Sequence, residues 1–397
     1  MRIGMLVDTY KPHVSGITNY IDLSKRHLEK AGHDVYVITF GRRGQADDEP
    51  HVLRSPGLPL GSTGYYFALR YSSAIQRILQ TMDVVQVHHP FLSGSLALRY
   101  CRPAGIPIVF TNHTRYDLYA RTYLPLLPEA VSRRFLKSYM ASFCAAVDLV
   151  ISPSAGMQAV LRGLGVTAPI EVVPNGINLD LFNDATSLQR SAMGFDESDI
   201  LLVYAGRVAR EKNVDFLLRA FAKVAAQVKN ARLLIIGGGQ KPIADELKAQ
   251  AAELGLSERV TFVGLIAYDS LPGYLAMCDV FVTASVSEVH PLSVIEAMAA
   301  GLPVIGIESP GVGDTVQDGT TGFLAPDDMA AFSDKVTRLC LDRELIGRMG
   351  DAARRASSAY SIERTTATML EHYQRLISEP RPQRRSRQGA GVVPDVN

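Results

Sequence analysis

The sequence predicts an α/β protein of two doubly wound domains, each a parallel sheet covered by helices on both faces. Three observations support this fold class. Short apolar runs alternate with segments of helical periodicity along both halves of the chain, which is typical of parallel sheets. The 397 residues exceed the ~250–300 at which a single hydrophobic core stops growing. A composition of 47% hydrophobic and 20% charged residues is that of a globular protein.

The first domain is expected over residues 1–182, where strand-like and helix-like segments alternate. Its strand candidates are 2–7, 34–39, 83–88, 107–111, 148–151 and 170–173. Its helix candidates are 17–31, 66–80, 92–104, 130–146 and 154–163. We expect each helix to return the chain to the same end of the sheet, so that ligands bind beyond the carboxyl ends of the strands.

The second domain is expected over residues 183–360, with a polar boundary segment at 182–199. Its strand candidates are 201–206, 232–237, 259–263, 279–284 and 303–306. Amphipathic segments such as 213–226 and 243–253 follow these strands. Residues 379–397 are polar, Pro-rich and basic, which predicts a disordered tail.

Charge, cysteines and hydropathy restrict the class of protein. The net charge is +1, so no overall field indicates nucleic acid binding. The four cysteines are far apart, as in a cytosolic protein with reduced thiols. A strand pattern begins at Arg2, so we expect no signal peptide, and no apolar run reaches the ~18 residues that span a bilayer. We therefore expect a cytoplasmic protein, with any membrane contact peripheral and on the inner face of the cell membrane.

The strongest motif is the segment 287–301, which follows the strand candidate 279–284. Pro291 suits the first position of a helix, because its fixed φ and missing N–H cost nothing there. Gly301 suits the C-terminal cap of that helix. The amino end of the helix predicts an anion site, because its N–H groups are unpaired and the helix dipole is positive there.

Two glutamates belong to this motif. Glu288 lies in the loop before the helix and Glu296 lies inside it, so both can face one ligand. The alternative is that each is a solvated surface glutamate. His290, Leu292 and Ser293 complete the amino end of the helix, and we expect them to contact the same ligand.

A second motif follows the strand candidate 201–206. Gly206 lets the backbone approach a ligand, and Arg207 and Lys212 can converge on one diphosphate. The alternative is a basic surface turn, which fits Arg210 better than the other two.

A third group of candidates follows the next two strands. Gly237 and Gly238 belong to a glycine run that can admit a nucleoside, although it is not the G-x-G-x-x-G of dinucleotide sites. Val263 and Ile266 flank backbone groups that can face a base.

In the N-terminal half, the loop after the first strand carries Tyr10, His13 and Gly16. Gly16 opens a helix and can lie against a phosphate or a sugar. The two domains are expected to face each other across a cleft. We expect Tyr10 and His13 on the face of the first domain that lines this cleft, which we call the acceptor side.

Histidines and tyrosines also follow the third and fourth strands. His88 and Tyr116 are expected on the acceptor side with Tyr119, and His113, after the fourth strand, is a further candidate site residue. A structural hydrogen-bonding role is an equal alternative for His88. These histidines lack the spacing and carboxylate neighbours of a zinc site, so no metal ligand is assigned.

Together these residues resemble glycosyltransferase family 4, the retaining nucleotide-sugar transferases of the GT-B fold, over about residues 1–375. The matching positions are Glu288 and Glu296 of the E-x7-E motif, Gly206, Arg207 and Lys212 of the phosphate motif, the segment 174–182, and His113. The departures are Ser15-Gly16 for Gly-Gly, His290-Pro291 after the first glutamate, Asn178 for Asp and Asp314 for Glu.

The resemblance implies roles for these positions. Glu296 is expected to bind the ribose hydroxyls and Glu288 to lie beside the donor sugar. Arg207 and Lys212 are expected to hold the diphosphate, with Gly16 in the loop that covers it.

The resemblance also implies the reaction. His113 is expected near the bond that breaks, and a helix at 361–378 should cross back to the first domain. Family members retain the anomeric configuration without a metal or other cofactor. We therefore expect catalysis by Glu288, His113, Arg207 and Lys212 without a nucleophilic side chain.

The run 111–125 resembles diacylglycerol glucosyl- and galactosyltransferases in particular. The helix after it carries Arg133, Arg134 and Lys137 among apolar residues, which suits an anionic membrane surface; an ordinary sheet-covering helix is the alternative. The expected donor is UDP-glucose or UDP-galactose, and the expected acceptor is a hydroxyl group of a lipid such as diacylglycerol.

Other functions stay open at this point. A transferase with a polysaccharide or small glycoside as acceptor has the same motifs. A phosphorylase or epimerase shares the architecture, and a non-catalytic module can bind nucleotide-sugar without turnover. The missing dinucleotide fingerprint disfavours a nicotinamide dehydrogenase.

Overall fold

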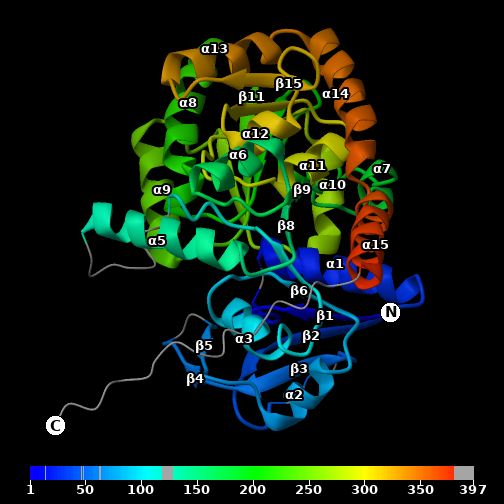
Figure 1. The fold of residues 1–397 in the computed structure, drawn as a ribbon. Coiled ribbons are helices and arrows are strands. Elements are labelled where there is room, and N and C mark those ends of the chain that lie inside the picture. Colours follow the sequence, from blue (N-terminus) through cyan, green and yellow to red (C-terminus); the bar gives the residue numbers. More distant parts are fainter. Residues whose placement is uncertain (14, 46, 48, 62–63, 119–127, 380–397) are drawn as a thin grey trace, which may run out of the picture.

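The computed structural model describes residues 1–13, 15–45, 47, 49–61, 64–118 and 128–379. It contains two parallel sheets with helices on both faces, one above the other in Figure 1. This confirms the predicted fold class. Tyr119 and residues 380–397, for which predictions were made, lie outside the described residues.

The N-terminal sheet is parallel throughout, in the order β3-β2-β1-β6-β7-β8-β9. Its strands are β1 (Arg2–Leu6), β2 (Asp34–Gly41), β3 (Val52–Pro56), β6 (Val84–Val87), β7 (Ile108–Thr111), β8 (Leu149–Ser152) and β9 (Ile170–Val172). Its helices are α1 (Gly16–Lys30), α2 (Ser73–Leu79), α3 (Leu92–Tyr100), α5 (Glu129–Cys144) and α6 (Ala155–Gly163). β6, β7 and β8 are buried along their whole length, which explains their near-continuous apolar sequences.

The C-terminal sheet is also parallel, in the order β12-β11-β10-β13-β14-β15. Its strands are β10 (Ile200–Ala205), β11 (Ala231–Ile236), β12 (Val260–Gly264), β13 (Val280–Thr283), β14 (Val304–Ile307) and β15 (Gly322–Ala325). The helices of this half are α7 (Asp180–Asn183), α8 (Val214–Gln227), α9 (Lys241–Glu253), α10 (Leu271–Met277), α11 (Leu292–Ala299), α12 (Pro310–Thr315), α13 (Met329–Cys340) and α14 (Arg343–Ser357). The order reverses between β10 and β13, so the loops after these two strands open side by side at one sheet edge.

One predicted helix is shorter than expected. Residues 66–80 were predicted to be helical, but Tyr66–Phe67 forms β5, which pairs antiparallel with β4 (Leu58–Pro59). The helix begins only at Ser73, because Ser72 has extended backbone and its hydroxyl accepts a hydrogen bond from the N–H of Ile75. The aromatic run before Ser72 therefore forms a small hairpin beside the sheet.

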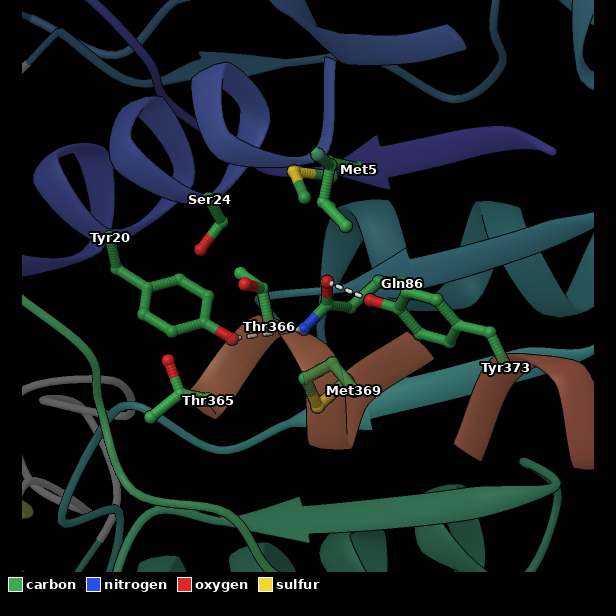
Figure 2. A pocket seen from close by; sticks show the side chains of 9 residues that line it. Met5, Tyr20, Ser24, Gln86, Thr365, Thr366, Met369 and Tyr373 are labelled. Atoms are coloured by element: carbon green, nitrogen blue, oxygen red, sulfur yellow. Dashed lines mark hydrogen bonds between the residues drawn. The ribbon is translucent and has the colours of Figure 1, made fainter. Parts of the chain in front are cut away.

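The last helix, α15 (Ile362–Ser378), returns to the N-terminal sheet and packs beside α1 (Figure 1). The phenol of Tyr373 is buried and donates to Oε1 of Gln86 on β6 at 2.6 Å. Beside this bond lies a cavity of about 10 Å³, lined by residues of β1, α1, β6 and α15 (Figure 2). That volume is about the size of one water molecule, so the helix is closely seated. The predicted crossing of the C-terminal helix is confirmed.

Two chain segments connect the halves and bond to each other. The N–H of Ile177 donates to the carbonyl of Tyr360, and the N–H of Ile362 donates to the carbonyl of Ile177, both at 2.9 Å. A Cβ at Gly176 would lie 2.2 Å from the hydroxyl of Thr365, so only glycine allows this approach. The outgoing and returning chains thus form one paired connection.

Candidate active site

The centre of the site is an ion pair between the loops that follow β10 and β13. Nζ of Lys212 lies 2.5 Å from a carboxylate oxygen of Glu288, and both side chains are largely buried. Burial acts to raise the pKa of Glu288, but Lys212, then a hydrogen bond from Ser285, then Arg207 together outweigh it, so that the pKa lies below its ordinary value. Glu288 is therefore an anion between two cations. The structure brings Glu288 to the loop of Arg207 and Lys212, although 76 positions separate Lys212 from Glu288 in the sequence.

The second cation is more open to solvent. The guanidinium of Arg207 pairs with Glu211, and the backbone carbonyl of Arg207 accepts a hydrogen bond from the phenol of Tyr204 at 2.9 Å. Tyr204 thus fixes the backbone while the charged end stays accessible. By contrast, Arg210 pairs with Glu246 on the surface, as the alternative for that residue predicted.

Helix α11 directs its amino end toward the loop of this ion pair. Pro291 is the N-cap rather than the first helical residue, a correction of one position, and no side chain caps the helix. The N–H groups of Leu292 and Ser293 are in the first turn, where a helix offers no acceptor of its own. An anion bound there would meet these N–H groups and the positive end of the helix dipole.

Glu296 is buried inside α11, with 4% of the residue exposed. Its Oε1 accepts a hydrogen bond from the phenol of Tyr268 at 2.7 Å. Burial raises the pKa of Glu296 from 4.5 to about 7, although the bond from Tyr268 acts to lower it. Tyr268 was not predicted, because it lies in a short 3-10 turn outside every motif. Its position after β12 was the only signal that could have found it.

The glycine run after β11 has a different local reason from the one predicted. A Cβ on Gly237 would lie 1.8 Å from the carbonyl oxygen of Gly206, and one on Gly239 would lie 2.0 Å from that of Val208. The run therefore lets the β11 loop pack directly on the loop that carries Arg207. Contact of Gly237 and Gly238 with a nucleoside stays a prediction.

The remaining predicted donor residues of this half lie in the apolar cluster behind the site. Val263 and Ile266 are partly buried there, as is Leu292. Gly264, between the first two, has φ +83° and its carbonyl accepts from the N–H of Gly237 at 2.8 Å. A backbone hydrogen bond thus joins the two strand ends that we expect beside the base.

The N-terminal half faces this group of charges through the loop after β1. The pKa of His13 is lowered by burial and then by the charge of Arg207, which belongs to the other half. The ring of Tyr65 lies 6.1 Å from that of His13 and 6.4 Å from that of His89. Apart from its chain neighbours and the backbone of α1 itself, no heavy atom of the described residues lies within 4 Å of a Cβ placed on Gly16, so the start of α1 has open space.

A histidine cluster lies deeper in this half. Nδ1 of His88 and Nε2 of His113 are 3.0 Å apart, and Tyr20 contacts both rings at their edges. Burial lowers the pKa of His113 to about 3, and burial and His113 lower that of His88 further below its ordinary value. Both rings are neutral, so His113 is suited to hydrogen bonding rather than to proton donation near neutral pH.

Three residues expected on the acceptor side are instead part of the core. His88 and Tyr116 are fully buried, and Tyr10 is buried with its hydroxyl 3.5 Å from Glu49. All three follow strands, as predicted, but their side chains are buried instead of accessible. His13 is the acceptor-side candidate that stays accessible among those described.

His290 also differs from its expected position. Its ring contacts Tyr360 at 5.1 Å, and its Nδ1 accepts from the N–H of Asn175 at 3.2 Å. Burial lowers its pKa to about 4, which keeps the ring neutral. The side chain therefore faces the paired connection between the halves, and this packing does not favour the donor contact predicted for it.

The arrangement offers cations and helix N–H groups for a dianionic ligand and a carboxylate for hydroxyl groups. Among the described residues, no group of three His, Cys, Asp or Glu side chains could hold a metal ion. Metal independence stays a prediction.

Comparison with known proteins gives matches over both halves. The family model described as Glycosyltransferase Family 4 matches residues 14–181, and that of Glycosyl transferases group 1 matches residues 186–356. The alpha-monoglucosyldiacylglycerol synthase of Streptococcus pneumoniae is 31% identical, over 82% of this chain and 75% of that protein. The enzyme of the same name from Acholeplasma laidlawii is 30% identical, over 81% and 84% respectively.

Solved structures share the fold. Sucrose-phosphate synthase from Thermosynechococcus elongatus has a TM-score of 0.77 at 22% identity, covering 95% of this chain and 99% of that one. Anabaena HepE in complex with UDP and glucose has a TM-score of 0.74 at 22% identity, covering 94% and 100%.

Proposed function

The chain belongs to glycosyltransferase family 4, and on that premise we propose that it transfers glucose or galactose from UDP to a hydroxyl group of diacylglycerol, with retention of configuration, at an anionic membrane surface. The observation that carries this proposal is the convergence of Arg207, Lys212 and the amino end of α11 around Glu288. These groups suit a diphosphate, and Glu288 beside them suits the hydroxyl groups of a sugar.

The charge distribution explains how the site would accelerate transfer. As the bond between the anomeric carbon and the diphosphate breaks, negative charge grows on the leaving oxygen. Fixed cations stabilise that charge in the transition state more than in the bound donor. The acceptor oxygen attacks from the same face, and its proton passes to the departing diphosphate. Neither a nucleophilic side chain nor a metal ion is required by this sequence of events.

A lipid acceptor is supported by the apolar surface beside the N-terminal part of the site. The β4–β5 hairpin and Leu69, which follows it, carry exposed leucines, with 72% of Leu58 and 74% of Leu69 accessible. The hydroxyl of Thr9 donates to the carbonyl of Gly64 at 3.1 Å, and the next residue, Tyr65, contacts His13. An acyl chain on the hairpin would therefore place its headgroup close to the expected acceptor side.

Helix α5 extends the same surface. Phe135 is 54% exposed, with Arg133 and Arg134 exposed near it on the helix. Tyr139 of α5 lies 3.3 Å from the hydroxyl of Ser95 on α3, and Arg99 of α3 donates to the carbonyl of Leu69 at 3.3 Å. α3 thus joins the basic helix to the apolar hairpin, a combination that suits anionic lipid.

The relatives support the acceptor and the donor. Two are named alpha-monoglucosyldiacylglycerol synthases, and one solved neighbour is a complex with UDP and glucose. Every described helix is too short or too polar to span a bilayer. Together with four buried free thiols, this supports a peripheral position on the cytoplasmic face.

The test is transfer of labelled hexose from UDP-glucose and UDP-galactose to diacylglycerol in vesicles with and without phosphatidylglycerol. We expect labelled glycolipid, more with anionic lipid, and the same rate with a chelator. Product from a polysaccharide or a soluble glycoside but not from diacylglycerol would refute the lipid acceptor. Donor binding with neither transfer nor donor hydrolysis would indicate a non-catalytic module.

A matched pair of variants tests the surface. Leu58→Ser with Leu69→Ser should lower the rate on vesicles but not on acceptor dispersed in detergent. Leu341→Ser is the control, because Leu341 is 69% exposed but lies between α13 and α14 in the C-terminal half. Equal rates for the two variants on vesicles would show that the hairpin does not contact lipid.

A further inference from the structure

The loop that carries Glu288 is held from both halves of the molecule. On its own side, Glu288 pairs with Lys212. From the other half, the hydroxyl of Ser154 donates to the carbonyl of Val289, the residue after Glu288, at 3.0 Å. Ser154 is itself the N-cap of α6, where it accepts from the N–H of Met157, so its position is fixed by the N-terminal sheet.

The next residue of the loop is held by the connection between the halves. The side-chain amide of Asn175 donates to the carbonyl of His290 at 2.9 Å, while the backbone N–H of Asn175 donates to Nδ1 of the same residue at 3.2 Å. Both residues are buried. Any residue at 290 would supply the carbonyl, but the acceptor for the N–H of Asn175 is the imidazole Nδ1, which gives a physical reason for a histidine at this position.

Packing follows the same pattern as the hydrogen bonds. The side chain of Val289 is buried in the hydrophobic cluster of the N-terminal half, which includes Met157 and Leu161 of α6. On the other face of the loop, a Cβ on Gly311 of α12 would lie 2.6 Å from the carbonyl oxygen of Glu288. The loop has little room to move while the halves are in contact.

We propose that Ser154 and Asn175 are positioning residues for the transfer reaction: from the N-terminal half they fix the backbone after Glu288, so that this carboxylate is aligned with the donor sugar only while the two halves are engaged. The inference rests on the proposed function, because it assigns Glu288 to the donor sugar. Nucleotide binding at Glu296 does not depend on these bonds, since Glu296 lies within α11 itself. Transfer and nucleotide affinity should therefore respond differently.

The experiment compares Ser154→Ala and Asn175→Ala with wild-type protein. Each loses a hydrogen bond to the loop, and we expect kcat to fall about tenfold while the Kd for UDP, from calorimetry, changes less than about twofold. Ser154→Thr keeps the hydroxyl and should restore kcat. Unchanged kcat, or an equal loss of nucleotide affinity, would overturn the proposal.

Ser72→Ala controls for the lost helix cap. Ser72 caps α2 in the same half, as Ser154 caps α6, but it does not touch the Glu288 loop. A fall in kcat for Ser72→Ala as large as that for Ser154→Ala would mean that general destabilisation explains both.

Hydrogen–deuterium exchange separates this inference from the proposed function. The backbone amides of 285–290 should exchange faster in Ser154→Ala than in wild type, whatever donor or acceptor the enzyme uses. Wild-type exchange rates in that loop would overturn the inference. Lack of hexose transfer by the wild-type enzyme would instead overturn the proposed donor or acceptor.

Discussion

The carboxyl group of Glu296 makes nucleotide binding depend on pH. Its pKa is raised to about 7 by burial, so near neutral pH about half of the free protein carries a proton there. We expect the two ribose hydroxyls of the donor to donate to this carboxyl group, which favours its ionised form. Binding should therefore release a proton, and affinity should rise as the pH increases.

The structure sets the size of this effect. A pKa raised from 4.5 to about 7 corresponds to about 3 kcal/mol, the free energy by which the buried site disfavours the ionised carboxylate before hydroxyl groups bind to it. Below the raised pKa, each unit of pH should weaken binding by up to about tenfold. A Kd for UDP-glucose about tenfold higher at about pH 6 than at about pH 8 is the expected outcome.

Calorimetry at several pH values checks this, with two buffers of different ionisation enthalpy to count the released protons. UDP-glucose is preferable to UDP because its diphosphate has no ionisation near neutral pH. Glu296→Gln should bind more weakly, with an affinity that does not change with pH. A wild-type Kd that is the same at both ends of the range, with no proton release, would refute the reasoning.

The free energy of unfolding should change with pH in the direction opposite to donor affinity. Two substitutions test other parts of the site. Because the folded-state pKa of Glu296 is raised, its protonated form contributes to the free energy of unfolding; this contribution is fully present below pH 4.5 and is lost as the pH rises through about 7. The melting temperature of Glu296→Gln should therefore not show this decrease over the same pH range. Arg207→Ala should lower kcat more than it raises the KM for acceptor, because the cation acts on the leaving group; unchanged kcat at saturating donor would exclude Arg207 from the mechanism. Gly237→Ala should cost about 3 kcal/mol or more in chemical denaturation, since its Cβ would lie 1.8 Å from the Gly206 carbonyl. Gly347→Ala is at an exposed helical position where, apart from the adjoining helix backbone, no atom of the described chain lies within 4 Å of the new Cβ. This substitution should instead stabilise by up to about 1 kcal/mol, and equal effects of the two would contradict the steric argument.

The periodicity of the sequence predicted much of the fold. Most strand candidates agree with the structure to within two residues, because buried parallel strands have apolar runs on both faces. β3 and β15 were not predicted; both are edge strands, and each has a Pro or a Gly at one end, which reads as a turn. β5 was read as the start of a helix and β4 was not predicted, because two-residue strands leave no periodic signal.

The site shows a similar division. Glu288, Lys212 and Arg207 could be placed together, because the carboxyl ends of neighbouring parallel strands meet at one sheet edge. The burial of Tyr10 and Tyr116 could not be predicted, since strand ends fix where a residue lies but not which way its side chain turns. Bonds across the two halves, such as that of Ser154, join separate motifs and have no local pattern.

The return of α15 has a consequence for dissecting the protein. Helix α15 packs on α1 and β6 through the side chains of Thr366, Met369 and Tyr373. A fragment that stops at residue 182 would therefore leave apolar surface and Gln86 exposed to water. The N-terminal half is thus encoded in two separate stretches, with the C-terminal half inserted between them. Expression of the N-terminal half alone should succeed only when residues 361–379 are fused behind it through a short flexible link.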